Sequence, residues 1–96
     1  MFTRHFAHWP PGQPRILELP KESVYANLVA SAAKHPDRAA IDYYGSRLSY
    51  AELKRQVDAL AGWLQRRYGV ARGDRVLLYA QNSPQFVIAY YAILRA

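Results

Sequence analysis

Residues 75–94 constrain the fold of this chain more than any other segment. Residues 75–80 (RVLLYA) predict a strand, and four successive apolar side chains at 76–79 predict that it is buried on both faces, as in parallel sheets. A loop at Gln81 and Asn82 follows, and residues 85–94 then predict a helix that is apolar nearly all round. Such a helix is buried on all sides, either inside a larger protein or in a membrane. Ninety-six residues cannot easily surround both elements.

The order of these elements predicts that the chain is a truncated part of a larger domain. A strand followed by a helix normally continues into a parallel strand that completes the crossover, and no such strand follows in this sequence. The sequence stops at residues 94–96 (LRA) without a glycine cap or a proline. The alternative is a small obligate oligomer that buries the last helix between subunits.

A helix and a hairpin are predicted upstream. Residues 24–35 predict a helix with Ser23 as its N-cap and Pro36 as its stop, because apolar side chains recur at helical spacing. Two short β-prone runs, 39–44 and 47–49, flank the pair Gly45 and Ser46, which predicts a tight hairpin turn at that pair.

A second helix is predicted from Ser49 to Gly69. Ser49 and Glu52 have the spacing of a capping box, in which each side chain satisfies a free backbone donor. The residues that share the apolar stripe of this helix are Leu53, Val57, Leu60, Ala61 and Leu64, with Trp63 beside it. The predicted fold class is therefore α/β, in the order helix, short β-hairpin, helix, buried parallel-type strand, helix.

Residues 1–22 are predicted to be an irregular, proline-rich arm, separate from the domain part at residues 23–96. Four prolines forbid a continuous helix, and apolar side chains among them indicate an arm packed along another surface. No apolar signal segment precedes the first prolines, and the longest apolar run, 86–94, is far shorter than the ~20 residues of a transmembrane helix. We therefore expect a cytoplasmic protein with no transmembrane segment.

The net charge of +6 allows an alternative function, a freestanding basic module that binds nucleic acid or anionic lipid. The 13 basic residues are spread along the chain without a run longer than two, and no nucleic-acid motif accompanies them. We favour an ordinary solvated surface and no specific nucleic-acid partner. The absence of cysteine excludes a disulfide framework, a thiolate nucleophile and a thiolate metal site.

Several segments, in this order and spacing, resemble the opening of the adenylate-forming superfamily, which comprises acyl-CoA synthetases, peptide-synthetase adenylation domains and luciferases. These segments are 35–41 (HPDRAAI), 48–53 (LSYAEL), 60–64 (LAGWL), 69–76 (GVARGDRV), 81–83 (QNS) and 92–96 (AILRA). In the arm, 9–12 (WPPG) and 19–20 (LP) are most similar to the fatty acyl-CoA ligases of this superfamily. The resemblance covers residues 20–96 well and the first twenty loosely.

The resemblance implies that the chain is the N-terminal part of a fatty acyl-CoA synthetase, inactive alone. The parent would use ATP and magnesium to convert a fatty acid to an acyl-adenylate, and coenzyme A would then displace AMP. Its partners would be the rest of the parent polypeptide and a fatty acid, with a homodimer allowed. The phosphate loop and the catalytic residues of this superfamily lie beyond residue 96. The resemblance therefore transfers no catalytic, cofactor-binding or metal-binding residue, and no cofactor is expected within this part.

Individual polar side chains near the N-terminal half have structural interpretations. His5 and His8 have a spacing seen in metal sites, but two ligands without a nearby acid or cysteine are insufficient. His35, directly before Pro36, is expected to interact favourably with the C-terminus of the first helix.

Side chains in the C-terminal half also have structural interpretations. Asp74 is expected to be a turn residue rather than a catalytic acid. Asn82 and Ser83 lie at a strand-to-helix junction, where α/β proteins often hold anions, but we expect helix capping there. Tyr90 and Tyr91 are expected in a core or an interface rather than stacked on a nucleobase.

Overall fold

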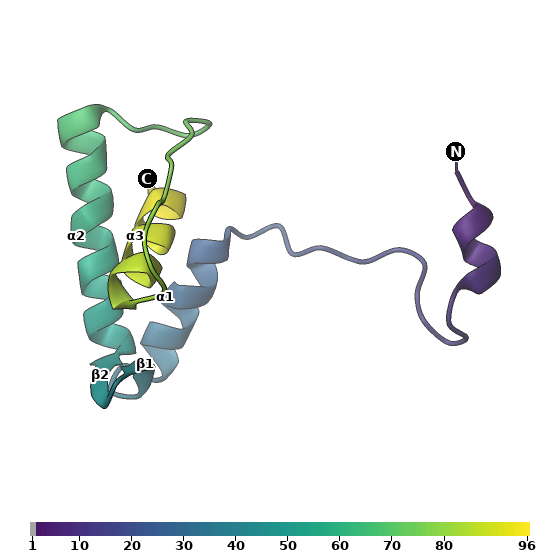
Figure 1. Ribbon diagram of the computed structural model, residues 1–96, viewed down its shortest axis with the longest axis horizontal. Coiled ribbons are helices and arrows are strands. Elements are labelled where there is room, and N and C mark those ends of the chain that lie inside the picture. The colour runs from purple at the N-terminus through teal and green to yellow at the C-terminus, as the bar shows by residue number, and fades with distance from the viewer. Residues whose placement is uncertain (1) are drawn as a thin grey trace.

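Three α-helices, one short 3-10 helix and one antiparallel hairpin make up the protein, as described by a computed structural model for residues 2–96. The elements are η1 (Arg4–His8), α1 (Val24–Lys34), β1 (Ala39–Tyr43), β2 (Ser46–Ser49), α2 (Tyr50–Tyr68) and α3 (Pro84–Arg95). The long helix α2 packs against both α1 and α3, and the hairpin closes one end of the helices (Figure 1). The mixed α/β class is confirmed on these elements.

The ends of the helices follow the local sequence. The Ser49 Oγ atom accepts a hydrogen bond from the Glu52 N–H (3.2 Å), and the Ser83 Oγ atom accepts one from the Phe86 N–H (3.3 Å). These N-caps satisfy backbone donors that have no partner inside the helix. At the other end of α2, Gly69 adopts φ +65°, a left-handed conformation that glycine reaches without steric cost. The predicted ranges of all three helices are thus confirmed to within a residue or two.

The hairpin turn differs from the prediction by one residue. The strands pair with Tyr43 opposite Ser46, so the turn residues are Tyr44 and Gly45 rather than Gly45 and Ser46. Both have positive φ, +50° and +82°, as a two-residue turn of type I′ requires. The sequence interpretation assumed that glycine opens the turn, whereas here it is the second turn residue and Tyr44 takes the less favourable left-handed position.

The core lies along one face of α2. Its buried members are Leu28, Leu53, Val57, Ala61 and Ala92, contributed by all three α-helices. Val57 is completely inaccessible, and the predicted stripe of α2 is confirmed as the face that packs on α1 and α3. The stripe of α1 is only partly covered, since Val24 and Val29 remain exposed.

The predicted strand at residues 75–80 does not form. This segment is an extended coil between α2 and α3 (Figure 1), and none of its backbone groups hydrogen-bonds to the backbone of another residue within 2–96. Leu77 and Tyr79 are 90% and 96% exposed, so the expected burial on both faces is wrong for this chain. The physical reason is that a strand needs a neighbouring strand, and the sheet formed within residues 2–96 contains β1 and β2 and does not include this segment. Parallel pairing of this segment stays a prediction.

The last helix is covered on one side only. Ala92 is buried and Val87, Ile88 and Tyr91 pack against the core, whereas Tyr90 and Leu94 are exposed. Burial on all sides is therefore wrong for this chain, because the helices that pack against α3 within residues 2–96, α2 and α1, cover one side of it. Within residues 2–96, no helix combines the length and apolar character needed to cross a membrane.

The arm extends away from the helices (Figure 1). Its apolar side chains Phe2, Ile16, Leu17 and Leu19 are exposed, so the surface along which we expected the arm to pack is not within the described chain. One short 3-10 helix, η1, precedes the prolines. The division between residues 1–22 and 23–96 stays a prediction.

Candidate functional site

A polar cluster joins all three helices beside the core. Tyr25 of α1 donates a hydrogen bond from its hydroxyl to Asp58 Oδ1 of α2. Lys54, one helical turn before Asp58, donates from Nζ to Asp58 Oδ2 at 2.6 Å. The guanidinium carbon of Arg95, at the end of α3, lies 5.3 Å from the centre of the Tyr25 ring. The carboxylate of Asp58 therefore lies at the centre of the cluster and accepts hydrogen bonds from both Tyr25 and Lys54.

The environment sets the ionisation of this cluster. Burial alone would raise the pKa of Asp58, but the hydrogen bonds from Lys54 and Tyr25 and the positive charges of Lys54 and Arg95 lower it overall. Burial and the bond to Asp58 raise the pKa of Tyr25, and the same carboxylate raises the pKa of Lys54. At neutral pH the cluster thus holds an ionised acid, a charged amine and a protonated phenol. None of these groups is a free base or nucleophile, so the arrangement ties the helices together and offers no acid–base chemistry.

A concavity of about 870 Å³ borders this cluster. It lies among the start of α1, the loop at 70–74 and the end of α3, and its charged lining residues are Lys54, Arg72, Asp74 and Arg95. Two of these are already engaged, because Lys54 pairs with Asp58 and the Asp74 carboxylate accepts the Ala71 N–H at 2.8 Å. The mixed charges give no basis for assigning a ligand.

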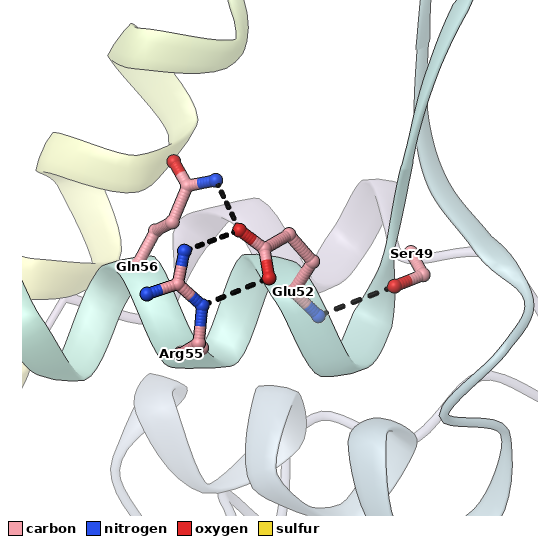
Figure 2. Close-up of polar contacts among 4 residues, drawn as sticks. All are labelled: Ser49, Glu52, Arg55 and Gln56. Atoms are coloured by element: carbon pink, nitrogen blue, oxygen red, sulfur yellow. Dashed lines mark hydrogen bonds and ion pairs between the residues drawn. The ribbon is translucent and has the colours of Figure 1, made fainter.

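The start of α2 carries a second set of polar contacts (Figure 2). Glu52 accepts hydrogen bonds from Arg55 Nε (2.9 Å) and Nη2 (2.5 Å) and from Gln56 Nε2 (2.8 Å). The bonds from Arg55 and Gln56 lower the pKa of Glu52 to about 2. Only half of the predicted capping box is present: Ser49 caps α2, but Glu52 turns to Arg55 and Gln56 instead of the Ser49 N–H. Ser49 is also the last residue of β2, opposite Ala39 in the hairpin.

The histidines lie in separate places. His5 and His8 are in η1, where the His5 ring lies 4.2 Å from the Phe6 ring and 5.8 Å from the Trp9 ring, centre to centre. His35 is the C-cap of α1 and donates its backbone N–H to Ser31 O. Among residues 2–96, no three His, Cys, Asp or Glu side chains gather closely enough to hold a metal ion.

Asp74, Ser83 and Tyr91 have the structural roles expected of them, whereas Tyr90 does not lie in the core. Asp74 closes the turn after α2 through its bond to the Ala71 N–H, and Ser83 caps α3. Tyr91 packs against the core, while the neighbouring Tyr90 is exposed and meets it edge to face. The structure brings none of these residues together into one site.

The Tyr25–Asp58 contact is the feature that sequence reasoning missed. Lys54 and Asp58 have the four-residue spacing of a helical ion pair, which is a visible signal. Tyr25 counted only as part of the apolar stripe of α1, and its sequence separation from Asp58 gives no local hint of the contact. A tyrosine at the edge of an apolar stripe, facing a helix with such an ion pair, is the signal that could have suggested it.

Comparison with known proteins connects the sequence of this chain to one family. The family model described as AMP-binding enzyme matches residues 28–96, which include α1 from Leu28 onward and every later element. No solved structure gives a significant match.

Three curated relatives illustrate the range of the likeness. A long-chain-fatty-acid–CoA ligase of Bacillus subtilis is 39% identical over 90 residues, which are 94% of this chain and 16% of that protein. The enzyme of the same name in Haemophilus influenzae is 36% identical over 92 residues, 95% of this chain and 16% of its own. A D-alanine–D-alanyl carrier protein ligase of Listeria welshimeri is 35% identical over 74 residues, 77% of this chain and 14% of its own. The chain thus spans about 16% of the length of the two fatty-acid ligases.

Proposed function

Starting from the fact that this chain belongs to the AMP-binding enzyme family, we propose that it is the N-terminal part of a fatty acyl-CoA synthetase. The observation that carries the proposal is the extent of the likeness. The matches to the two fatty-acid ligases cover 94% and 95% of the chain and so include most of the proline-rich arm. The match to the D-alanine ligase covers 77%. Similarity in the arm therefore favours a fatty acid over an amino acid as the substrate of the longer enzyme.

The proposed reaction has two steps. The carboxylate of the fatty acid attacks the α-phosphorus of ATP, which releases pyrophosphate and leaves an acyl-adenylate. The thiolate of coenzyme A then attacks the acyl carbon, which forms the thioester and releases AMP. Magnesium would neutralise the phosphates in the first step. Because ATP and coenzyme A are cytoplasmic metabolites, the proposal places the enzyme in the cytoplasm, and it allows a homodimer.

Residues 23–96 contribute structure to this enzyme rather than chemistry. The ionisable groups of the three-helix cluster are paired with one another, and Glu52 is held by Arg55 and Gln56. These contacts orient α1 and α3 on α2 and leave no free base or nucleophile among them. We propose that ATP, magnesium and coenzyme A bind to later parts of the longer polypeptide, and that this part alone has no ligase activity.

The test is to follow the reading frame beyond residue 96 and assay the protein it encodes. We expect pyrophosphate release that depends on a fatty acid, followed by acyl-CoA formation when coenzyme A is added. Release of pyrophosphate with D-alanine and loading of a carrier protein would instead assign an amino-acid ligase. A stop codon after Ala96 would contradict the proposal outright. The 96-residue chain serves as the control and should release no pyrophosphate with either substrate.

A further inference from the structure

Tyr25 of α1 contacts both of the other α-helices through different parts of its side chain. Its hydroxyl donates a hydrogen bond to Asp58 Oδ1 of α2. The guanidinium group of Arg95, at the end of α3, lies over the face of its ring, with 5.3 Å between the guanidinium carbon and the ring centre. A hydrogen bond to one helix and a cation–aromatic contact with another thus meet on a single, partly buried side chain.

We infer that Tyr25 and Asp58 couple the start of α1 to the end of α3, so that the two helix ends open together. The hydrogen bond to Asp58 holds the phenol ring in place, and the ring held in this way provides the surface on which Arg95 lies. The Asp58 carboxylate also attracts Arg95 directly, because the positive charge of Arg95 helps to lower the pKa of Asp58. Loss of either contact should therefore weaken the other, since both belong to one network.

The coupling acts on the ends of two helices. Tyr25 is the second residue of α1, and Arg95 is the last residue of α3. Both border the concavity of about 870 Å³ together with Lys54, so the cluster sets how closely the two helix ends approach each other there. Helix ends open more readily than helix centres in folded proteins. All contacts of the cluster lie within residues 25–95, and the inference does not depend on the proposed function.

Hydrogen exchange of the backbone amides, measured by NMR on the 96-residue chain, tests the coupling. Tyr25→Phe removes the hydroxyl but keeps the ring, so the bond that it deletes lies between α1 and α2. We expect the amides in the last two turns of α3 to exchange about two- to fivefold faster, which is the scale of one partly exposed hydrogen bond. The amides around Val57, at the completely inaccessible centre of α2, are the internal reference and should keep their rates.

Tyr43→Phe is the matched control. Tyr43 belongs to β1, and its ring meets the neighbouring Tyr44 ring edge to face rather than a helix of the cluster. Removal of its hydroxyl should leave the exchange rates in α1 and α3 unchanged. Arg95→Gln tests the coupling from the other side and alters an exposed side chain, so the fold should be kept. Because coupling free energies are reciprocal, this variant should speed exchange in the first two turns of α1.

A third variant tests whether the coupling depends on Asp58. In an Asp58→Ala background the Tyr25 hydroxyl has lost its acceptor, so Tyr25→Phe should cause no further change in α3. A further acceleration there would overturn the inference. Faster exchange confined to α1 in Tyr25→Phe would also overturn it, because α3 would then be held independently of the phenol. Equal acceleration around Val57 would do the same, since the substitution would then act on global stability.

Discussion

The buried face of α2 and the extended segment at residues 75–80 are both strongly apolar, yet the structure treats them in opposite ways. Leu53, Val57 and Ala61 are almost completely removed from solvent, whereas Leu77 and Tyr79 are almost completely exposed. Apolar character alone therefore does not determine burial in this chain. The difference lies in how each segment satisfies its backbone.

A helix forms its backbone hydrogen bonds within itself, so α2 completes its core with apolar side chains from α1, α3 and the hairpin. An extended segment has its donors and acceptors on its edges and needs another strand beside it. The hairpin is not this partner, because within residues 2–96 its two strands form a separate two-stranded sheet that residues 75–80 do not join. Residues 75–80 thus have the side chains of a core element without the backbone partner that would make them one.

A leucine-to-alanine substitution in each of the two regions should give the largest difference in the free energy of unfolding. Leu53→Ala removes side-chain volume from the core beside Val57 and is expected to lower the free energy of unfolding by about 2–5 kcal/mol. Leu77→Ala, at a position 90% exposed, should change it by less than about 0.5 kcal/mol. Urea unfolding followed by circular dichroism measures both. Equal losses would mean that residues 75–80 are packed in solution.

A substitution at the end of α2, between the two regions, should have the next largest effect on stability. Gly69 ends α2 with φ +65°, and Gly69→Ala is expected to cost about 1–2 kcal/mol because a Cβ atom is strained there. Gly12, in the arm, also has positive φ (+80°), so Gly12→Ala is the matched control. The arm can relax without unpacking a helix, so the control should have little effect on thermal unfolding. A similar loss for both variants would contradict this account of the helix end.

Loss of the N-cap of α3, which follows the extended segment, should lower the free energy of unfolding by less than the substitution of Gly69. Ser83→Ala removes the acceptor of the Phe86 N–H and is expected to lower the free energy of unfolding by about 1 kcal/mol. Ser23 has the same position before α1, but its side chain makes no capping hydrogen bond. Ser23→Ala should therefore cost clearly less than Ser83→Ala in the same urea titration. The reverse order would show that the cap of α3 is not formed in solution.

The smallest expected effect is the pH dependence of the packed region. The pKa values of Asp58 and Glu52 are lowered in the folded protein, the latter from 4.5 to about 2, so the unfolded chain binds protons more readily. Their contribution to stability is complete above the unfolded values of 3.8 and 4.5 and is lost as the pH falls through the lowered ones. Since both side chains are more than a third accessible, solvent screens the effect and the slope should be shallow.

Urea unfolding between neutral and acidic pH checks this slope. Asp58→Asn and Glu52→Gln should each flatten the acid side of the profile. An unaltered slope in the double variant Asp58→Asn, Glu52→Gln would assign the acid sensitivity to other carboxylates.

Much of the local structure was predictable from particular residues. Ser49, Gly69 and Ser83 mark the helix boundaries because capping depends on groups within a few positions of one another. The hairpin was also predictable, but its turn was misplaced by one residue, since two adjacent positions compete for the left-handed conformation. The candidate site was less accessible to prediction. The Lys54–Asp58 pair follows from helical spacing, whereas its contact with Tyr25 depends on how α1 crosses α2.

The sequence by itself thus determined where the helices begin and end, which face of α2 is buried, and the resemblance to adenylate-forming enzymes. Only the tertiary structure decided the fate of residues 75–80, the one-sided burial of α3 and the polar cluster around Asp58. The physical reason is the range of the interactions. Caps, turns and helical stripes depend on neighbours in sequence, but strand pairing and contacts between helices depend on which distant segments are present to meet them.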